Sequence, residues 1–146
     1  MRGVIAAFAA IGAALAGYLV FERYTGGVIS CTTGGCETVQ HSSYSSLAGI
    51  PVAVLGLCAY VAIFALSFIL TETARAAQLA IAVAGVAFSG YLLWVQAVPI
   101  GAFCDWCLAS DAIMTVIALL VLLRIRAAQG FSAAHPRSIP SKGDTA

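Results

Sequence analysis

The chain has 146 residues, 62% of them hydrophobic and 9% charged, and its mean hydropathy is +1.00. These values lie far outside the balance of a soluble domain, so they exclude one as the main architecture. The net charge of +1 gives no reason to expect a nucleic-acid partner.

Four apolar runs are each close to the length needed to cross a hydrocarbon core, about 20 helical residues. They cover residues 3–21, 52–70, 76–98 and 108–123. Lipid offers no hydrogen-bond partners to the backbone, so we expect these runs to be helices. The predicted fold class is all-α: an integral four-helix bundle, residues 1–126, embedded in the lipid bilayer.

The first run also resembles a secretory signal peptide, because a basic start and an apolar core precede the small residues 14–16. Against cleavage, the apolar run continues to Phe21 and is long enough to span a membrane. We therefore predict a retained first helix. Its many Gly and Ala residues favour close approach of a neighbouring helix.

Basic residues are distributed unevenly about the four runs. Arg23 lies alone on one side of a four-helix topology. The opposite side holds Arg2, Arg75, Arg124, Arg126, Arg137 and Lys142. The positive-inside rule then places both termini in the cytoplasm. We expect a multi-pass protein of the cell (inner) membrane, with loops 22–51 and 99–107 facing the periplasm or the cell exterior.

The first outer loop and the C-terminal tail have no spanning segment. In the loop, an interfacial helix is predicted because apolar and small residues recur at helical spacing. These residues are Val39, Ser43, Leu47 and Ile50. Pro51 suits the first turn of the second spanning helix. Residues 127–146 are polar and rich in Gly, Pro and Ser, so a disordered cytoplasmic tail is predicted there.

Four of the five cysteines fall on the outer side. Cys31 and Cys36 form a C-x4-C pair, and Cys104 and Cys107 form a C-x2-C pair. The fifth, Cys58, lies within a span and is interpreted as a small apolar residue. Two such pairs outside the membrane suit structural disulfides, a tetrahedral zinc site or a redox relay.

The relay is the favoured interpretation. Disulfides that close such short loops restrict the unfolded chain little and are poor structural links, and an oxidising milieu disfavours zinc-bound thiolates. Cys107 would lie in the first turn of the last helix, where the helix dipole stabilises a thiolate. At this point a metal-binding membrane protein and a structural membrane protein with inert disulfides remain open alternatives.

One composite pattern is typical of a known family. The pattern C-x4-C-E-x-V-x-x-S-x-Y-x4-GIP-x4-G-x3-Y runs from Cys31 to Tyr60, and FCDWC follows at 103–107. Together they resemble the vitamin K epoxide reductase family over about residues 5–125. The chain is similar to its short bacterial members, which lack a fused thioredoxin-like domain.

The resemblance implies a four-helix bundle around a quinone, either ubiquinone or menaquinone, and no metal. It also implies oxidation of a periplasmic thioredoxin-fold partner in support of disulfide-bond formation. By position, Cys31 would exchange with the partner and Cys36 with Cys104. Cys107 would lie next to the quinone, and Ser42 corresponds to a serine near the active site.

Phe103 and Asp111 complete the candidate quinone-binding or site-shaping residues. Asp111 lies one turn after Cys107 on the same helix face. It could relay protons to a quinone oxygen, or simply favour the N-terminal end of the helix. Val52 and Asp111 stand where vertebrate members carry an Asn and a Tyr, which favours quinone reduction over epoxide reduction. His41 is expected to be a solvated loop residue.

Overall fold

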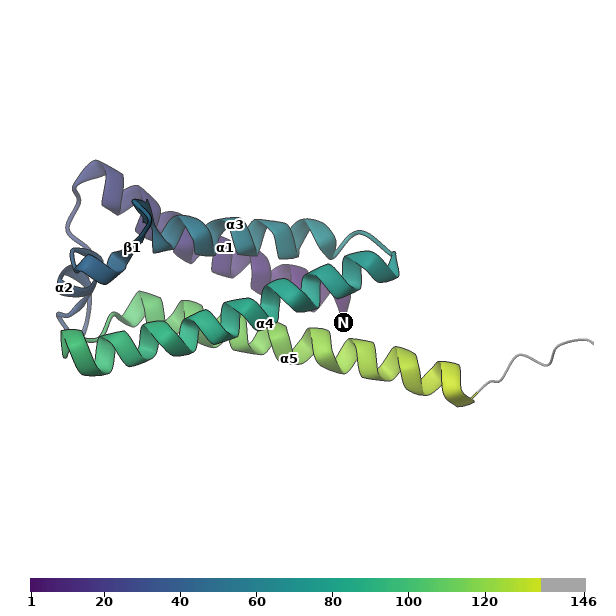
Figure 1. Cartoon of the computed structure of the whole chain (residues 1–146). Helices are drawn as coiled ribbons and strands as arrows, with labels where there is room; N and C mark the ends of the chain where they lie inside the picture. Colours follow the sequence, from purple (N-terminus) through teal and green to yellow (C-terminus); the bar gives the residue numbers. More distant parts are fainter. Residues whose placement is uncertain (135–146) are drawn as a thin grey trace, which may run out of the picture.

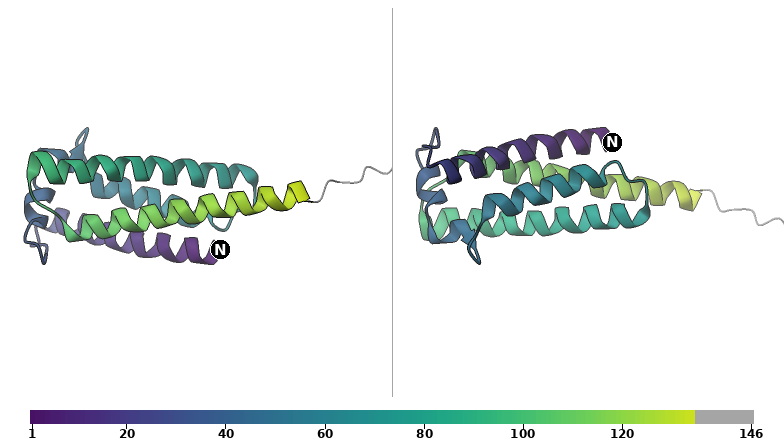
Figure 2. Two further views of the ribbon diagram at one scale, coloured as in Figure 1. Left: turned by 90° about the horizontal axis from the view of Figure 1, so that it is seen from below. Right: turned by 90° about the horizontal axis from the view of Figure 1, so that it is seen from above.

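The computed structural model describes residues 1–134. Four longer helices lie side by side, and the loops that join them gather at the two ends (Figure 1). Views from below and above show the same arrangement (Figure 2). The N-terminus, the turn between α3 and α4, and the end of α5 lie toward one end, and the loop with α2 lies at the other.

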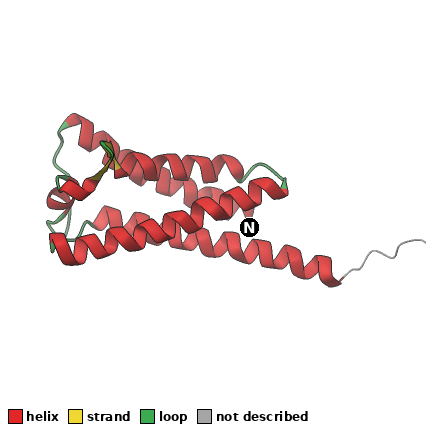
Figure 3. Ribbon diagram, in the orientation of Figure 1, coloured by secondary structure: helices red, strands yellow, loops and turns green. Residues whose placement is uncertain are grey.

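The longer helices are α1 (Arg2–Thr25), α3 (Val52–Leu66), α4 (Glu72–Val95) and α5 (Asp105–Ala134). A π-helical turn, η2 (Gln96–Ile100), continues α4. The loop between α1 and α3 contains α2 (Cys36–Gln40), η1 (Ser43–Ser45), β1 (Ser46–Leu47) and β2 (Ile50–Pro51). Nearly all of the described chain that is ordered into elements is helical (Figure 3), so the all-α prediction is confirmed.

Among residues 1–134, three helical segments are long and apolar enough to cross a membrane: Arg2–Thr25, Glu72–Ile100 and Asp105–Gln129. The second predicted span is shorter than expected, because α3 has 15 residues and ends at Leu66. That length corresponds to about 22 Å of helix, short of a hydrocarbon core of about 30 Å. After Leu66 the backbone tightens, and the amides of Phe68 and Ile69 bond to carbonyls three residues back.

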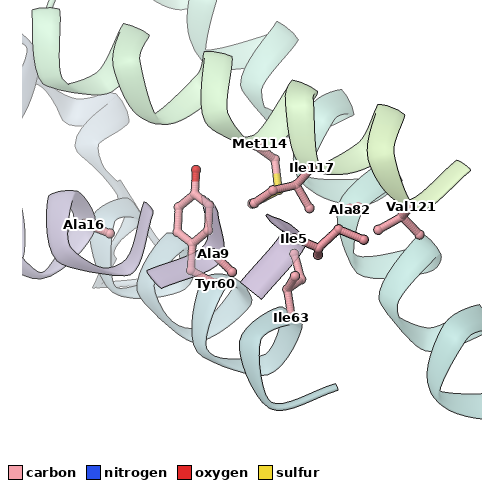
Figure 4. Close-up of a cluster of buried hydrophobic side chains, with 9 residues drawn as sticks. All are labelled: Ile5, Ala9, Ala16, Tyr60, Ile63, Ala82, Met114, Ile117 and Val121. Carbon is pink, nitrogen blue, oxygen red and sulfur yellow. The ribbon is translucent and has the colours of Figure 1, made fainter. Parts of the chain in front are cut away.

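Small residues bring the helices close together, as predicted for the first helix. A Cβ atom at Gly12 would lie 2.3 Å from the ring of Tyr60, so only glycine fits between α1 and α3. Gly85 of α4 lies in the same way against Met114 of α5. The core cluster is Ile5, Ala9, Ala16, Tyr60, Ile63, Ala82, Met114, Ile117 and Val121 (Figure 4).

One buried amide links the helices near the turn between α3 and α4. Gln78 is 1% exposed, and its Nε2 donates to the carbonyl of Ile63 at 3.1 Å and to Ser67 Oγ at 2.9 Å. Arg124 Nη1 lies 3.5 Å from Gln78 Oε1. The amide therefore supplies hydrogen bonds to a backbone carbonyl and a side-chain hydroxyl where α3 ends.

The predicted interfacial helix is only partly correct. A short helix is present in the loop, but it is α2 at Cys36–Gln40. Farther along, Leu47 pairs with Ile50 in an antiparallel hairpin instead of continuing a helix. The backbone explains the difference: Ala48 and Gly49 have positive φ angles, and a residue that precedes proline, here Ile50, disfavours the helical region.

The last helix is longer than predicted. α5 continues to Ala134, so the disorder expected from residue 127 onward does not apply to residues 127–134. Alanine, the best helix former, recurs in this stretch. The rest of the predicted tail, residues 135–146, lies outside the described residues.

Candidate active site

Both cysteine pairs meet in one buried cluster, at the end of the molecule where α2 and the start of α5 lie (Figure 1). Cys36 and Cys104 are each 0% exposed and belong to one buried cluster with Leu19 and Ile29. Cys31 and Cys107 pack against this cluster and are half-buried. The four outer cysteines singled out from the sequence are therefore brought together, although the two pairs are almost seventy residues apart.

The two pairs are in different redox states. Cys31 and Cys36 form a disulfide, whereas Cys104 and Cys107 are free thiols. Cys58, on α3, is also free and is exposed. The site thus combines one disulfide, which can accept two electrons, with one dithiol, which can donate two.

The disulfide loop is held to the C-x2-C segment by hydrogen bonds. Asp105 Oδ2 accepts the backbone N–H of Thr32 at 2.8 Å and that of Thr33 at 3.2 Å. The Thr33 hydroxyl donates to the carbonyl of Phe103 at 2.9 Å. Thr32 and Thr33 directly follow Cys31, so these bonds fix the position of the disulfide.

Aromatic and backbone contacts reinforce this docking. Trp106 Nε1 donates to the carbonyl of Ser30 at 2.9 Å, and its ring centroid lies 5.0 Å from that of Tyr18 on α1. Gly35 is buried against Phe103, and a Cβ atom there would lie 2.4 Å from the Phe103 carbonyl oxygen. The loop can therefore approach this closely only with glycine at position 35.

Cys104 occupies the N-cap position of α5. Its sulfur accepts the backbone N–H of Cys107 at 3.3 Å, which is the bond that an N-cap side chain makes to the third helical residue. The hydrogen bond with the Cys107 side chain lowers the pKa of the Cys104 thiol, while burial opposes the change. The expectation that Cys107 carries the stabilised thiolate is thus corrected: the N-cap geometry favours a thiolate at Cys104.

Two glutamines at the site were not identified from the sequence. Gln96, which is 2% exposed, accepts the backbone N–H of Cys104 through Oε1 at 2.8 Å. Gln40, which is 8% exposed, places Nε2 4.0 Å from Cys107 Sγ. Gln96 could have been identified from the sequence, because it is a polar side chain near the end of an apolar span and needs a hydrogen-bond partner there.

A cavity of about 420 Å³ opens beside the C-x2-C segment. Its walls are mainly apolar and come from all four longer helices and the loop. Cys107 and Asp111 both line it, and Asp111 Oδ2 is buried with no hydrogen-bond partner among residues 1–134. An apolar cavity of this size with a few polar groups is typical of a small-molecule site.

The remaining predicted residues are placed differently. Ser42 lines the cavity, and its hydroxyl donates to the Val39 carbonyl at 2.8 Å. Phe103 does not line the cavity; the residue is 40% exposed, and its backbone contacts the loop. His41 is exposed, with Nε2 3.0 Å from Glu37 Oε1.

Within residues 1–134, no three His, Cys, Asp or Glu side chains are grouped so that they could hold a metal ion. In the observed state two of the four outer cysteines are joined to each other. They therefore cannot act as thiolate ligands in that state.

Membrane-length apolar helices, a disulfide and a dithiol packed beside it are the features of a membrane thiol oxidoreductase. Residues 3–122 match the model of the Vitamin K epoxide reductase family, and the chain belongs to that family. The match includes both cysteine pairs and confirms the family that was predicted from their pattern.

Proposed function

We propose that this protein oxidises a periplasmic thioredoxin-fold protein and passes the electrons through its two cysteine pairs to a membrane quinone. The quinone is ubiquinone or menaquinone, and the reaction supports disulfide-bond formation. One observation carries the proposal. Cys107 lines an apolar cavity large enough for a quinone head group, while Cys104 is buried in one cluster with Cys36 of the disulfide.

In the first step a thiolate of the reduced partner attacks Cys31, the more exposed sulfur of the loop disulfide. A bond forms between the partner and Cys31, the Cys31–Cys36 bond breaks, and Cys36 leaves with the electron pair. The second partner cysteine then displaces Cys31. The partner is oxidised, and the loop holds two thiols.

The second step is exchange between the pairs. The Cys36 thiolate attacks Cys104 of an oxidised Cys104–Cys107 disulfide, and Cys107 leaves as a thiolate. Cys31 then attacks Cys36 and releases Cys104. This restores the loop disulfide and leaves the second pair reduced, which is the combination present in the structure.

In the third step Cys104 and Cys107 reform their disulfide and give two electrons to the quinone. Two protons must accompany them. Asp111 lines the cavity together with Cys107, and its buried Oδ2 lacks a partner among residues 1–134. We assign to Asp111 the role of holding a proton for a quinone oxygen, and to Ser42 and Phe103 the role of shaping the site and its loop.

The membrane arrangement is also part of the proposal. All four longer helices span the bilayer, with α3 extended by the tightened turn that follows it. The cysteine end faces the periplasm or cell exterior, and both termini are cytoplasmic, because the basic residues gather at the opposite end. Val52, which also lines the cavity, and Asp111 support quinone reduction over epoxide reduction.

Trapping the thiol states in cells tests this function. Free thiols are alkylated with and without quinone depletion, in the wild type and in Cys107→Ala, with Cys58→Ala as a cysteine control remote from the site. We expect quinone depletion to leave the partner reduced, and Cys107→Ala to accumulate a disulfide between Cys36 and Cys104 or with the partner. A redox state that ignores quinone depletion would instead indicate inert structural disulfides, and stoichiometric zinc in the purified protein would indicate a metal site.

A further inference from the structure

Asp105 lies between the two pairs and belongs to neither. It is the first residue of α5, where a negative charge is favourable. Its Oδ2 accepts two consecutive backbone N–H groups from the loop, those of Thr32 and Thr33. Hydrogen bonds to an ionised carboxylate are stronger than those between neutral groups, so Asp105 is the principal polar contact between loop and helix.

The loop that carries the disulfide is not held in place by its own backbone. Gly34, with a φ of 73°, and Gly35 separate the loop cysteines, and glycine leaves a chain with the greatest conformational freedom. Disulfide exchange nevertheless requires one sulfur to approach another along a defined direction. The position of the loop therefore depends on contacts outside it, and Asp105 makes two of them, to the backbone of Thr32 and Thr33.

We propose that Asp105 is a positioning residue that docks the loop on the C-x2-C segment and thereby sets the rate of exchange between Cys36 and Cys104. The proposal rests on the proposed function, because it concerns its second step. In that step the Cys36–Cys104 bond forms and the Cys104–Cys107 bond breaks. Asp105 takes no electrons and no proton; it holds the two sulfurs in reach.

The same carboxylate distinguishes the two loop cysteines. Asp105 Oδ2 lies 3.4 Å from Cys31 Sγ. A disulfide sulfur has no hydrogen to donate, so this contact becomes a hydrogen bond only when Cys31 carries a proton. A carboxylate this close opposes a negative charge on Cys31. In the reduced loop, Cys31 is then the thiol that stays at Asp105, and Cys36 is the nucleophile.

The test follows quinol formation from purified protein in detergent, with all four site cysteines reduced beforehand and ubiquinone-1 as the probe. The Cys104–Cys107 pair supplies the first quinol directly. A second quinol forms only after the loop has passed its electrons to that pair. The two phases therefore separate the quinone step from the internal exchange in one stopped-flow trace.

We expect Asp105→Ala to slow the second phase by about ten- to a hundred-fold and to affect the first phase far less, since small misplacements of reacting groups have effects of that size. Asp105→Asn keeps an acceptor oxygen without the charge, so the rate of its second phase should lie between those of Asp105→Ala and the wild type. Trp106→Phe, which removes the bond to Ser30 and leaves a smaller ring beside Tyr18, should slow the same phase by less. Glu37→Gln, an exposed carboxylate of the same loop paired with His41, is the matched control and should behave as the wild type.

A second phase at the wild-type rate in Asp105→Ala would overturn the proposal. Equal slowing of both phases would also overturn it, because Asp105 would then act on the C-x2-C pair itself. A wild-type protein that forms no quinol in either phase would give a different result: it would refute the quinone reaction on which the proposal rests.

Discussion

The backbone nitrogen of Cys107 lies 3.3 Å from the sulfur of Cys104. Through this contact one cysteine of the C-x2-C pair caps the helix on which the other is carried. The two thiols are therefore unequal before any partner or quinone is present. Cys104 has the environment of a thiolate, and Cys107 has access to the cavity.

The ionisation of Cys104 should reflect this contact. In a Cys31→Ser, Cys36→Ser, Cys58→Ala background, ultraviolet absorbance should detect a thiolate that forms at lower pH than that of an ordinary cysteine, since the bond to the Cys107 side chain lowers the pKa of Cys104. A lowered pKa moves thiolate formation, and thiolate-dependent exchange, to lower pH. Adding Cys107→Ala removes the main cause, so the inflection should move to higher pH. An unchanged inflection would contradict the role given to the Cys107 side chain, because the backbone N–H of residue 107 is kept in this variant.

Gln96 should be required for the site and for stability. In Gln96→Leu the buried N–H of Cys104 loses its acceptor, which should cost about 1–3 kcal/mol and lower the melting temperature in detergent. Quinol formation should fall as well, because Cys104 is displaced. Gln78→Leu is the matched control: it removes an equally buried amide at the other end of the helices. It should lower the melting temperature but leave quinol formation by the remaining folded protein intact.

Gly12 should tolerate no side chain. The Cβ of Gly12→Ala would overlap the ring of Tyr60, so the helices must separate, at a cost of about 1–3 kcal/mol. Gly17→Ala on the same helix meets nothing within 4 Å and should stabilise α1 by roughly 0.5–1 kcal/mol. Thermal unfolding of both variants in the same detergent measures the difference. Equal melting temperatures would show that α1 does not pack on Tyr60 in this way.

Asp111 should affect the quinone step. Asp111→Asn keeps the shape of the side chain but cannot hold an exchangeable acid proton, so kcat for quinol formation should fall by about a hundred-fold. KM should change less, because the cavity keeps its walls. Thr115→Val, an exposed position one turn further along α5, should leave both parameters unchanged. A normal kcat in Asp111→Asn would show that Asp111 carries no proton to the quinone and only favours the N-terminal end of the helix.

The gathering of the cysteines could be predicted because helices of membrane length alternate direction, so the loop after α1 and the start of α5 reach the same end. The four apolar runs and the positions of the cysteines between them were sufficient for that prediction. The reversal at Ala48 and Gly49 was not predicted, since the apolar spacing of Leu47 and Ile50 suits a helix and the turn depends on local backbone angles.

The roles of individual polar groups were harder to predict. Asp105 was not identified from the sequence as a site residue, because only the folded loop brings Thr32 and Thr33 to it. Gln96 depends on the π-helical turn that ends α4, which no periodicity indicated. Conversely, Cys107 was expected to be the thiolate because it falls in the first turn of the last helix, and sequence position alone does not show that the Cys104 sulfur caps that helix.

The coexistence of a disulfide and a dithiol has a consequence for the timing of the reaction. While the C-x2-C pair is already reduced, the loop disulfide can still accept electrons from another partner molecule. On the proposed reaction, a chain can therefore continue to oxidise partners while its quinone is being exchanged. The second pair acts as a small reservoir that buffers protein oxidation against brief shortages of oxidised quinone in the membrane.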